Sequence, residues 1–211
     1  MAWNDVPALC MVWMRPAPPT RQDARRRAWH PRSGRPGQAC AGVQSEASRR
    51  CWRCRILAHE RRRILHFNVT AHPTAEWTAQ QLRHAFPWDS APRYLLRDRD
   101  RIFGDNFTRQ VQDMGIKQVL SAPRSPWQRA YVERIIGTIR RECLDHVIIF
   151  NEATLCRQVK SFAEYYHRSR THLSLSKDSP ESRAVHSPKL GRILAIPQVG
   201  GLHHRYERRA A

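Results

Sequence analysis

Residues 94–100 read YLLRDRD, and residues 125–134 read SPWQRAYVER. The first stretch predicts a short apolar strand that ends directly before Asp98. The second predicts a Ser/Pro loop followed by a helix over about residues 128–143, which carries Glu133. The two acids are separated by 34 residues and lie at the end of a strand and on a helix. Both are rigid elements, so the two carboxylates can be held as oxygen ligands of a divalent metal ion.

The charge of the chain indicates a polyanionic partner. Its 211 residues include 37 Lys and Arg against 18 Asp and Glu, for a formal net charge of +19, and 33 of the basic residues are arginines. Arginine makes planar, bidentate contacts with phosphate. Carboxylates held inside such a basic protein therefore suggest a metal site that acts on nucleic acid. For the charge taken alone, the codon bias of a GC-rich genome, which inflates Arg, Ala and Pro, stays open as an alternative.

Targeting signals are not evident. No apolar run approaches the ~20 residues that a membrane span needs, and the short apolar run at residues 8–14 follows no basic residue. We therefore expect a cytoplasmic protein. The six cysteines are not evenly spaced, and in a reducing compartment we expect free thiols.

Composition divides the chain into three parts. Residues 1–54 are rich in Pro and Arg and carry scattered Trp without periodicity, so we expect a basic, disordered segment. Its aromatic content is unusual for natural disorder and suggests a shifted or foreign reading frame. Residues 55–185 carry orderly apolar patterns and form the predicted core domain. Residues 186–211 are predicted as a basic C-terminal tail.

The core domain is predicted to be α/β with a mixed sheet. Strands are expected at residues 55–58, 64–70, 94–97 and 116–120, and helices at 75–86, 107–114, 128–143 and from Asn151 onward. Alternation of this kind is typical of an α/β fold. A nucleotide-binding fold would also alternate in this way, but no Gly-rich phosphate loop follows any of these strands, which disfavours Rossmann and P-loop proteins.

Five short motifs occur in order along the chain. They are LLRDRD (95–100), APRSPWQ (122–128), YVER (131–134), GTIRREC (137–143) and YYHRSRTH (165–172). From His66 onward the chain resembles the integrase core of bacterial insertion-sequence transposases, the DDE recombinases. The resemblance implies an RNase H-like mixed sheet flanked by helices and a Mg²⁺ or Mn²⁺ cofactor. It also implies DNA as partner, both insertion-sequence ends and target DNA, and a homo-oligomer.

The resemblance also implies roles for single residues. Asp98 matches the second catalytic acid and Glu133 the third, both as metal ligands, with Asp100 as the alternative to Asp98. The implied activity is DNA integration and transposition by two-metal phosphodiester cleavage and strand transfer. The implied DNA contacts are Arg134, Arg140, Arg141 and Trp127. Trp127 would stack on an unpaired base or pack onto its own domain.

Two departures from the family pattern bear on activity. The family carries its first catalytic aspartate on the first strand, and the matching region around residues 35–45 holds no acid within an apolar strand. We therefore expect the first strand and its acid to be missing. Arg129 stands where the family usually has a small or amide residue. The sequence thus predicts a transposase core with impaired catalysis, or, as the alternative, a nucleic-acid-binding remnant that does no chemistry.

Overall fold

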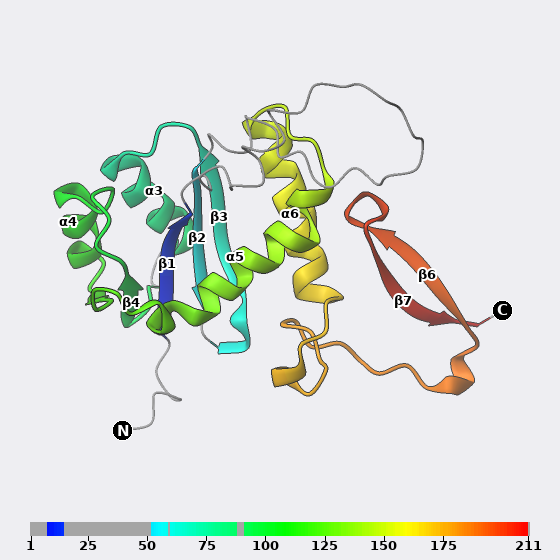
Figure 1. Cartoon of the computed structure of the whole chain (residues 1–211). Helices are drawn as coiled ribbons and strands as arrows, with labels where there is room; N and C mark the ends of the chain where they lie inside the picture. Colours follow the sequence, from blue (N-terminus) through cyan, green and yellow to red (C-terminus); the bar gives the residue numbers. More distant parts are fainter. Residues whose placement is uncertain (1–7, 15–51, 59, 88–90, 211) are drawn as a thin grey trace, which may run out of the picture.

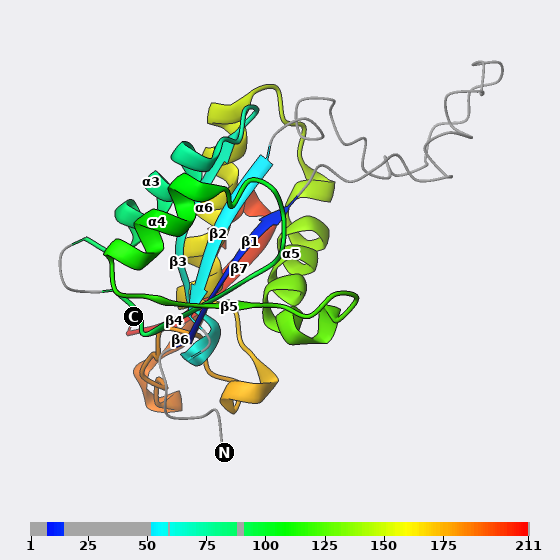
Figure 2. The ribbon, with the colours of Figure 1, turned by 90° about the vertical axis from the view of Figure 1, so that its left-hand side faces the viewer.

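The computed structural model describes residues 8–14, 52–58, 60–87 and 91–210. A five-stranded sheet lies between two helical layers, with α3 and α4 on one face and α5 and α6 on the other (Figures 1 and 2). A separate two-stranded hairpin, β6–β7, follows at the C-terminal end. The chain is therefore α/β, as the alternation of apolar patterns predicts.

The strand order of the sheet is β3-β2-β1-β4-β5. The antiparallel pair β2 (Trp52–Ala58) and β3 (Ile64–Thr70) forms one side, with the short turn η2 (Glu60–Arg62) between them. The parallel pair β4 (Tyr94–Arg97) and β5 (Lys117–Leu120) forms the other. Strand β1 (Ala8–Met14) joins the two sides, antiparallel to β2 and parallel to β4.

The expectation that the first strand is missing is corrected by β1. Residues 8–14 read ALCMVWM, an apolar run without Pro or Gly. A central strand has neighbours on both edges and tolerates such a continuous apolar run. The expectation rested on a first strand that carries an acid, and residues 8–14 carry none. The remainder of the predicted disordered segment, up to the start of β2, lies outside the described residues.

The first helical layer consists of α3 (Ala75–Ala85) and α4 (Asp105–Asp113). The side chain of Thr74 accepts a hydrogen bond from the backbone N–H of Trp77 and caps α3. After the C-terminal end of α4, Gly115 adopts a positive φ of 67°, which glycine accommodates without strain. The apolar core between these helices and the sheet includes the fully buried residues Ile56, Leu82, Leu95, Phe107 and Val111.

The second helical layer consists of α5 (Ala130–Glu142) and α6 (Glu152–Arg168). The short turns η3 (Pro126–Arg129) and η4 (Leu144–His146) precede and follow α5. The side chain of Asn151 accepts from the N–H of Thr154 and caps α6, as the sequence predicts. The apolar periodicity of both helices is confirmed by their buried faces, which include Ile135, Ile139, Leu155, Val159, Phe162 and Tyr166.

Two free thiols lie in this layer. Cys143 is buried and Cys156 is partly buried, and neither forms a disulfide. Burial raises the pKa of Cys143 to about 11, so this thiol stays protonated and unreactive at neutral pH. None of the helices within the described ranges combines the length and the apolar character of a membrane span.

The C-terminal tail is folded. After η5 (Leu173–Leu175) and η6 (Pro188–Leu190), strands β6 (Arg192–Gln198) and β7 (His203–Arg209) pair antiparallel around the turn η7 (Val199–Gly201). Val199 is buried in the α5–α6 core. The ring of His203 stacks on Tyr165 with 4.3 Å between centroids, and its Nε2 lies 2.8 Å from the Glu142 carbonyl oxygen. The turn end of the hairpin is therefore fixed to the core.

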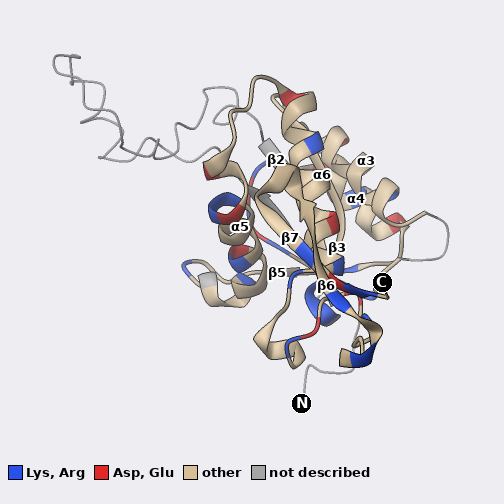
Figure 3. Ribbon diagram, turned by 90° about the vertical axis from the view of Figure 1, so that its right-hand side faces the viewer, with Lys and Arg blue, Asp and Glu red and all other residues tan. Residues whose placement is uncertain are grey.

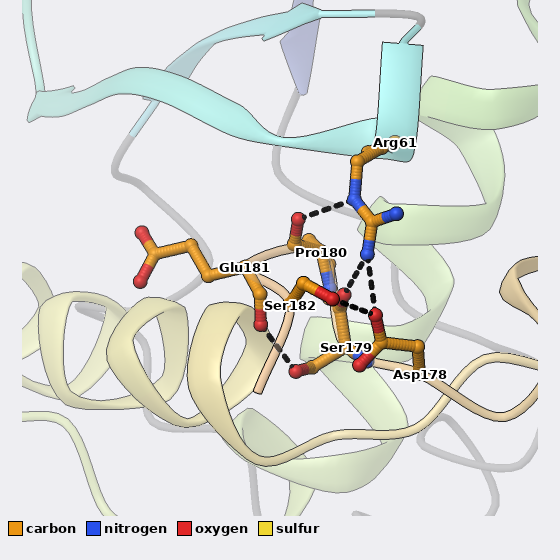
Figure 4. A network of polar contacts seen from close by, with 6 residues as sticks. All are labelled: Arg61, Asp178, Ser179, Pro180, Glu181 and Ser182. Carbon is orange, nitrogen blue, oxygen red and sulfur yellow. Dashed lines mark hydrogen bonds and ion pairs between the residues drawn. The ribbon is translucent and has the colours of Figure 1, made fainter. Parts of the chain in front are cut away.

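A polar network ties the segment before the hairpin to the β2–β3 turn (Figure 4). The guanidinium of Arg61 donates to Asp178 Oδ2 at 2.7 Å, and to the carbonyl oxygens of Ser179 at 2.7 Å and Pro180 at 2.8 Å. Hydrogen bonds from the Ser182 hydroxyl and the Ser179 N–H, together with Arg61, lower the pKa of Asp178 to about 2. Asp178 is therefore charged over the whole physiological range, and the network persists with it.

Candidate functional site

Asp98 and Glu133 are brought together by Arg129. Asp98 directly follows β4, Arg129 ends η3, and Glu133 lies in the first turn of α5. Arg129 Nη1 is 2.8 Å from Asp98 Oδ2, and Arg129 Nη2 is 3.9 Å from Glu133 Oε1. The Asp98 and Arg129 side chains are 22% and 20% exposed, whereas Glu133 is 47% exposed. The site is thus an acid–cation–acid triad with a close Asp98 contact and a looser Glu133 contact.

The second oxygen of Asp98 organises the turn behind β4. Asp98 Oδ1 accepts from the N–H of Asp100 at 3.2 Å, and Asp100 Oδ1 accepts from the N–H of Ile102 at 3.3 Å. Side chains of this kind commonly stabilise turns by bonding to the backbone two residues on. Both carboxylates of the DRD sequence are therefore engaged by the turn, and Asp98 also contacts Arg129.

Arg97 supports the position of Asp98, a role that sequence reasoning missed. Its side chain is buried at the end of β4, where Nε donates to Gln118 Oε1 at 2.7 Å and Nη1 donates to the Asp98 carbonyl at 3.0 Å. Its guanidinium also lies over the ring of Phe103, 5.2 Å from the centroid. Burial lowers the pKa of Arg97. The available signal was the alternation of β4, because Arg97 shares the buried face with Leu95.

The side chains present do not fit a two-metal centre. Magnesium sites are built from oxygen ligands, and here a guanidinium lies between the two carboxylates. In the part of the chain that the structure describes, no three His, Cys, Asp or Glu residues group into a potential metal site. Strand β1, whose Met11 pairs with Arg97 next to Asp98, carries no acid from residue 8 to residue 14. The neighbouring strand therefore supplies no third carboxylate.

The predicted DNA-contacting residues have different surroundings. Trp127 is 70% exposed, so most of its side chain is open to solvent. Arg134 is exposed on α5, and Arg140 Nε lies 3.7 Å from Asp145 Oδ1. Arg141 lies across Gly137, where an added Cβ would come within 2.8 Å of Arg141 Nη1. The space beside Gly137, where other residues have a side chain, is thus occupied by the Arg141 guanidinium of the same helix.

The YYHRSRTH motif forms a second polar cluster, at the C-terminal end of α5. Arg170 makes a bidentate ion pair with Glu142, with distances of 2.6 Å and 2.8 Å. Arg170 Nη1 lies 3.3 Å from His172 Nδ1, and the His172 ring packs edge-on against Tyr166 at 4.9 Å. The hydroxyl of Tyr166 donates to the Arg62 carbonyl at 3.3 Å. The motif therefore joins α5, α6 and the β2–β3 turn.

His172 should make the stability of the protein depend on pH. Burial, Arg170 and Arg62 together lower its pKa to about 4, from an ordinary value of 6.5. The unfolded chain binds this proton at higher pH than the folded one, so stability falls as pH drops from about 6.5 towards 4. We expect this residue alone to account for a loss of about 3 kcal/mol across that interval.

Urea unfolding at pH 7, 6 and 5 would measure this effect. A His172→Gln variant should show a flatter pH dependence than the wild type over this range. A His72→Gln variant, changed at an exposed histidine, should keep the wild-type slope. Identical slopes in all three proteins would contradict the assignment of the effect to His172.

Comparison with known proteins finds a family model that matches part of this chain. Residues 114–180 match the family model described as "Integrase core domain". This part of the chain is therefore similar to an integrase core domain. The matched region includes Arg129, Glu133 and the cluster around Arg170, and Asp98 lies upstream of it.

Two further proteins are similar to this chain. "Insertion element IS476 uncharacterized 39.2 kDa protein" of Xanthomonas euvesicatoria is 27% identical over 113 residues, which are 53% of this chain and 33% of the relative. The chain thus spans about a third of the length of that curated protein. A chain of the simian T-cell lymphotropic virus intasome, solved in complex with PP2A regulatory subunit B56 gamma, has 13% identity and a TM-score of 0.50. The match covers 74% of this chain and 60% of that one, and it concerns the fold.

Proposed function

We propose that the chain is a transposase-type integrase core that binds DNA and in which phosphodiester cleavage and strand transfer are impaired. The observation that carries the proposal is the position of Arg129 between Asp98 and Glu133. The strand order β3-β2-β1-β4-β5, with three antiparallel strands followed by two parallel ones, supports an RNase H-like sheet. The position of Asp98 after β4 and of Glu133 on α5 supports their assignment as the second and third acids of the family pattern.

DNA as the partner is supported by charge and by the relatives. The net charge of +19 favours a polyanion, and arginines are suited to phosphate contacts. The relatives are an insertion-element protein and an intasome chain. On this chain, Arg134, Arg141 and the exposed Trp127 are the proposed contacts near the acids, with the arginines on phosphates and Trp127 on a base.

The impairment of cleavage follows from the positive charge of Arg129 next to Asp98. Integrase cores generally depend on divalent metal ions, and carboxylates bind such ions best when no other cation neutralises them. Here Arg129 is already 2.8 Å from Asp98, and a metal ion would have to displace it. The same contact favours the second candidate function, DNA binding without any cleavage. The two functions differ only in residual nicking.

Nicking of supercoiled plasmid in Mg²⁺ or Mn²⁺ separates these functions. We expect salt-dependent DNA binding and slow residual nicking that a Glu133→Gln variant lowers further, whereas a nicking rate equal to that of Glu133→Gln would favour DNA binding without cleavage. Nicking by the wild type that is lost in Glu133→Gln would mean that the site is catalytically competent. Circular dichroism on both proteins would establish that they are equally folded.

Removing the Arg129 charge should expose the acids to metal. An Arg129→Gln variant is expected to bind Mn²⁺ about tenfold more tightly than the wild type, because a cation in contact with Asp98 is lost. Titration calorimetry or Mn²⁺ electron paramagnetic resonance would measure the affinity. Arg134→Gln, which removes the same charge one residue beyond Glu133, is the matched control and should change the affinity little. Equal affinities in Arg129→Gln and wild type would contradict the role of Arg129.

A further inference from the structure

A basic groove lies between the C-terminal hairpin and the segment that leads to it. Its volume is about 560 Å³. The hairpin stands beside α6, away from the five-stranded sheet, and basic residues occur on both of its strands (Figures 1 and 3). The basic and aromatic residues that line the groove are Lys177, Arg183, His186, Arg205, Tyr206 and Arg208. Neither Asp98 nor Glu133 lines it, so it is distinct from the acid triad.

The acids in the groove are already neutralised. Asp178 is paired with Arg61 at 2.7 Å, and Glu207 is paired with Arg205 at 2.6 Å. Among the ion pairs of the described residues, none involves Lys177, Arg183 or Arg208. The groove therefore presents three cationic side chains without an acidic partner, which is an electrostatic match for a polyanion.

One wall of the groove is fixed by hydrogen bonds, and the other carries exposed side chains. Arg208 Nη1 donates to the Gly191 carbonyl at 3.0 Å, and the Arg208 N–H donates to His186 Nδ1 at 3.2 Å, so this wall has a defined position. Lys177 and Arg183 are exposed on the opposite wall. One wall is therefore held by hydrogen bonds, and the cations of the other are free to meet a ligand.

An aromatic side chain accompanies the cations. Tyr206 lines the groove, is 60% exposed and lies beside His204, with 6.3 Å between ring centroids. Exposed aromatic rings next to basic side chains are typical of nucleic-acid surfaces, where rings meet bases and cations meet phosphates. A two-stranded ribbon is also narrow enough to enter the major groove of duplex DNA. These features favour nucleic acid over other polyanions.

We propose that this groove binds the phosphate backbone of DNA and forms a second contact surface, separate from α5. The inference rests on the proposed DNA-binding function and specifies where the additional contact is made. Lys177 and Arg183 meet phosphates from the segment side, and Arg208 meets them from the hairpin side. Tyr206 lies against the sugar or base next to them.

Lysine acetylation of the intact wild-type protein gives a direct test. The chain has four lysines, and only Lys177 lines the groove. Bound duplex DNA should slow acetylation of Lys177 several-fold, as read by mass spectrometry of peptides. Lys160, exposed on α6, is the internal reference and should react at the same rate with and without DNA. Equal rates at Lys177 in the two conditions would overturn the proposal.

Salt-dependent binding of a matched pair of variants gives the second test. Lys177→Gln with Arg183→Gln removes two groove cations, and Arg157→Gln with Lys160→Gln removes two exposed cations from α6. By fluorescence anisotropy, the groove variant should lower the slope of log affinity against log salt by about 2, whereas the α6 variant leaves it unchanged. Both pairs consist of exposed residues, so folding is not expected to differ.

The outcomes separate the groove from the proposed function. DNA binding with an unchanged slope in the groove variant would overturn the groove and leave the proposed function standing. Failure of the wild type to bind DNA would overturn both. Tighter binding of single-stranded RNA than of duplex DNA, lost in the same groove variant, would overturn DNA as the occupant.

Discussion

Replacing Phe162 by alanine is expected to lower the free energy of unfolding by about 4 kcal/mol. Phe162 lies on α6, is fully buried, and belongs to the core that α5 and α6 form against the sheet. Its ring also contacts His203 of the hairpin, with 5.9 Å between centroids. Alanine would leave a cavity that rigid neighbours cannot fill, and the loss would reach both the helical layer and the base of the hairpin.

Urea or thermal unfolding followed by circular dichroism would measure this loss. Phe162→Leu, which keeps most of the volume, should cost less than about 1.5 kcal/mol. Phe150→Ala removes the same ring from a site that is 76% exposed, and it should change stability by less than about 0.5 kcal/mol. If the two alanine variants were equally stable, the proposed packing of Phe162 in the core would be wrong.

Replacing Arg170 by glutamine is expected to lower the free energy of unfolding by about 2 kcal/mol. The Arg170 and Glu142 side chains are 24% and 31% exposed, and their bidentate contact joins α5 to the segment after α6. Without Arg170, the Glu142 carboxylate keeps its partial burial but loses its partner, and this desolvation is the main cost. The partial exposure of both groups keeps the loss below that of a fully buried pair.

The pH dependence identifies this contribution. The hydrogen bond from Arg170 lowers the pKa of Glu142 below its ordinary value of 4.5. The stabilisation is therefore complete above about pH 4.5 and is lost as pH falls through the lower pKa of the folded state. The stability difference between wild type and Arg170→Gln should shrink in that acidic range. Arg168→Gln, which breaks the more exposed Arg168–Glu181 pair, is the control and should cost under about 0.5 kcal/mol.

Periodicity alone predicted most of the helices and strands after residue 55. Helices α3 and α6 have apolar positions at helical spacing and side-chain caps at Thr74 and Asn151, and both features are local. Strand β1 was not predicted, because its partner β4 lies far away in sequence and no local pattern shows that pairing. The hairpin β6–β7 was read as a tail because its stabilising contact, His203 on Tyr165, is also long-range.

The candidate site was predicted in part. The strand end and the helix placed Asp98 and Glu133 in the same region, and the structure brings both to Arg129. Sequence reasoning noted Arg129 as unusual but did not specify its ion pairs, because they depend on how η3 meets the end of β4. The support from Arg97 was missed for a similar reason, since Gln118 lies on the neighbouring strand.

The position of β1 has a consequence for folding. The hairpin β2–β3 is local in sequence and can form early. Strand β1 pairs with β4, with Ala8 opposite Tyr94, and this pairing joins the β4–β5 side of the sheet to β2–β3. Closing so long a loop is entropically costly, so assembly of the complete sheet is a late and comparatively slow event. Until then β2 and β4 each expose an edge with unpaired backbone groups. During folding we therefore expect intermolecular strand pairing at these edges to compete with the insertion of β1.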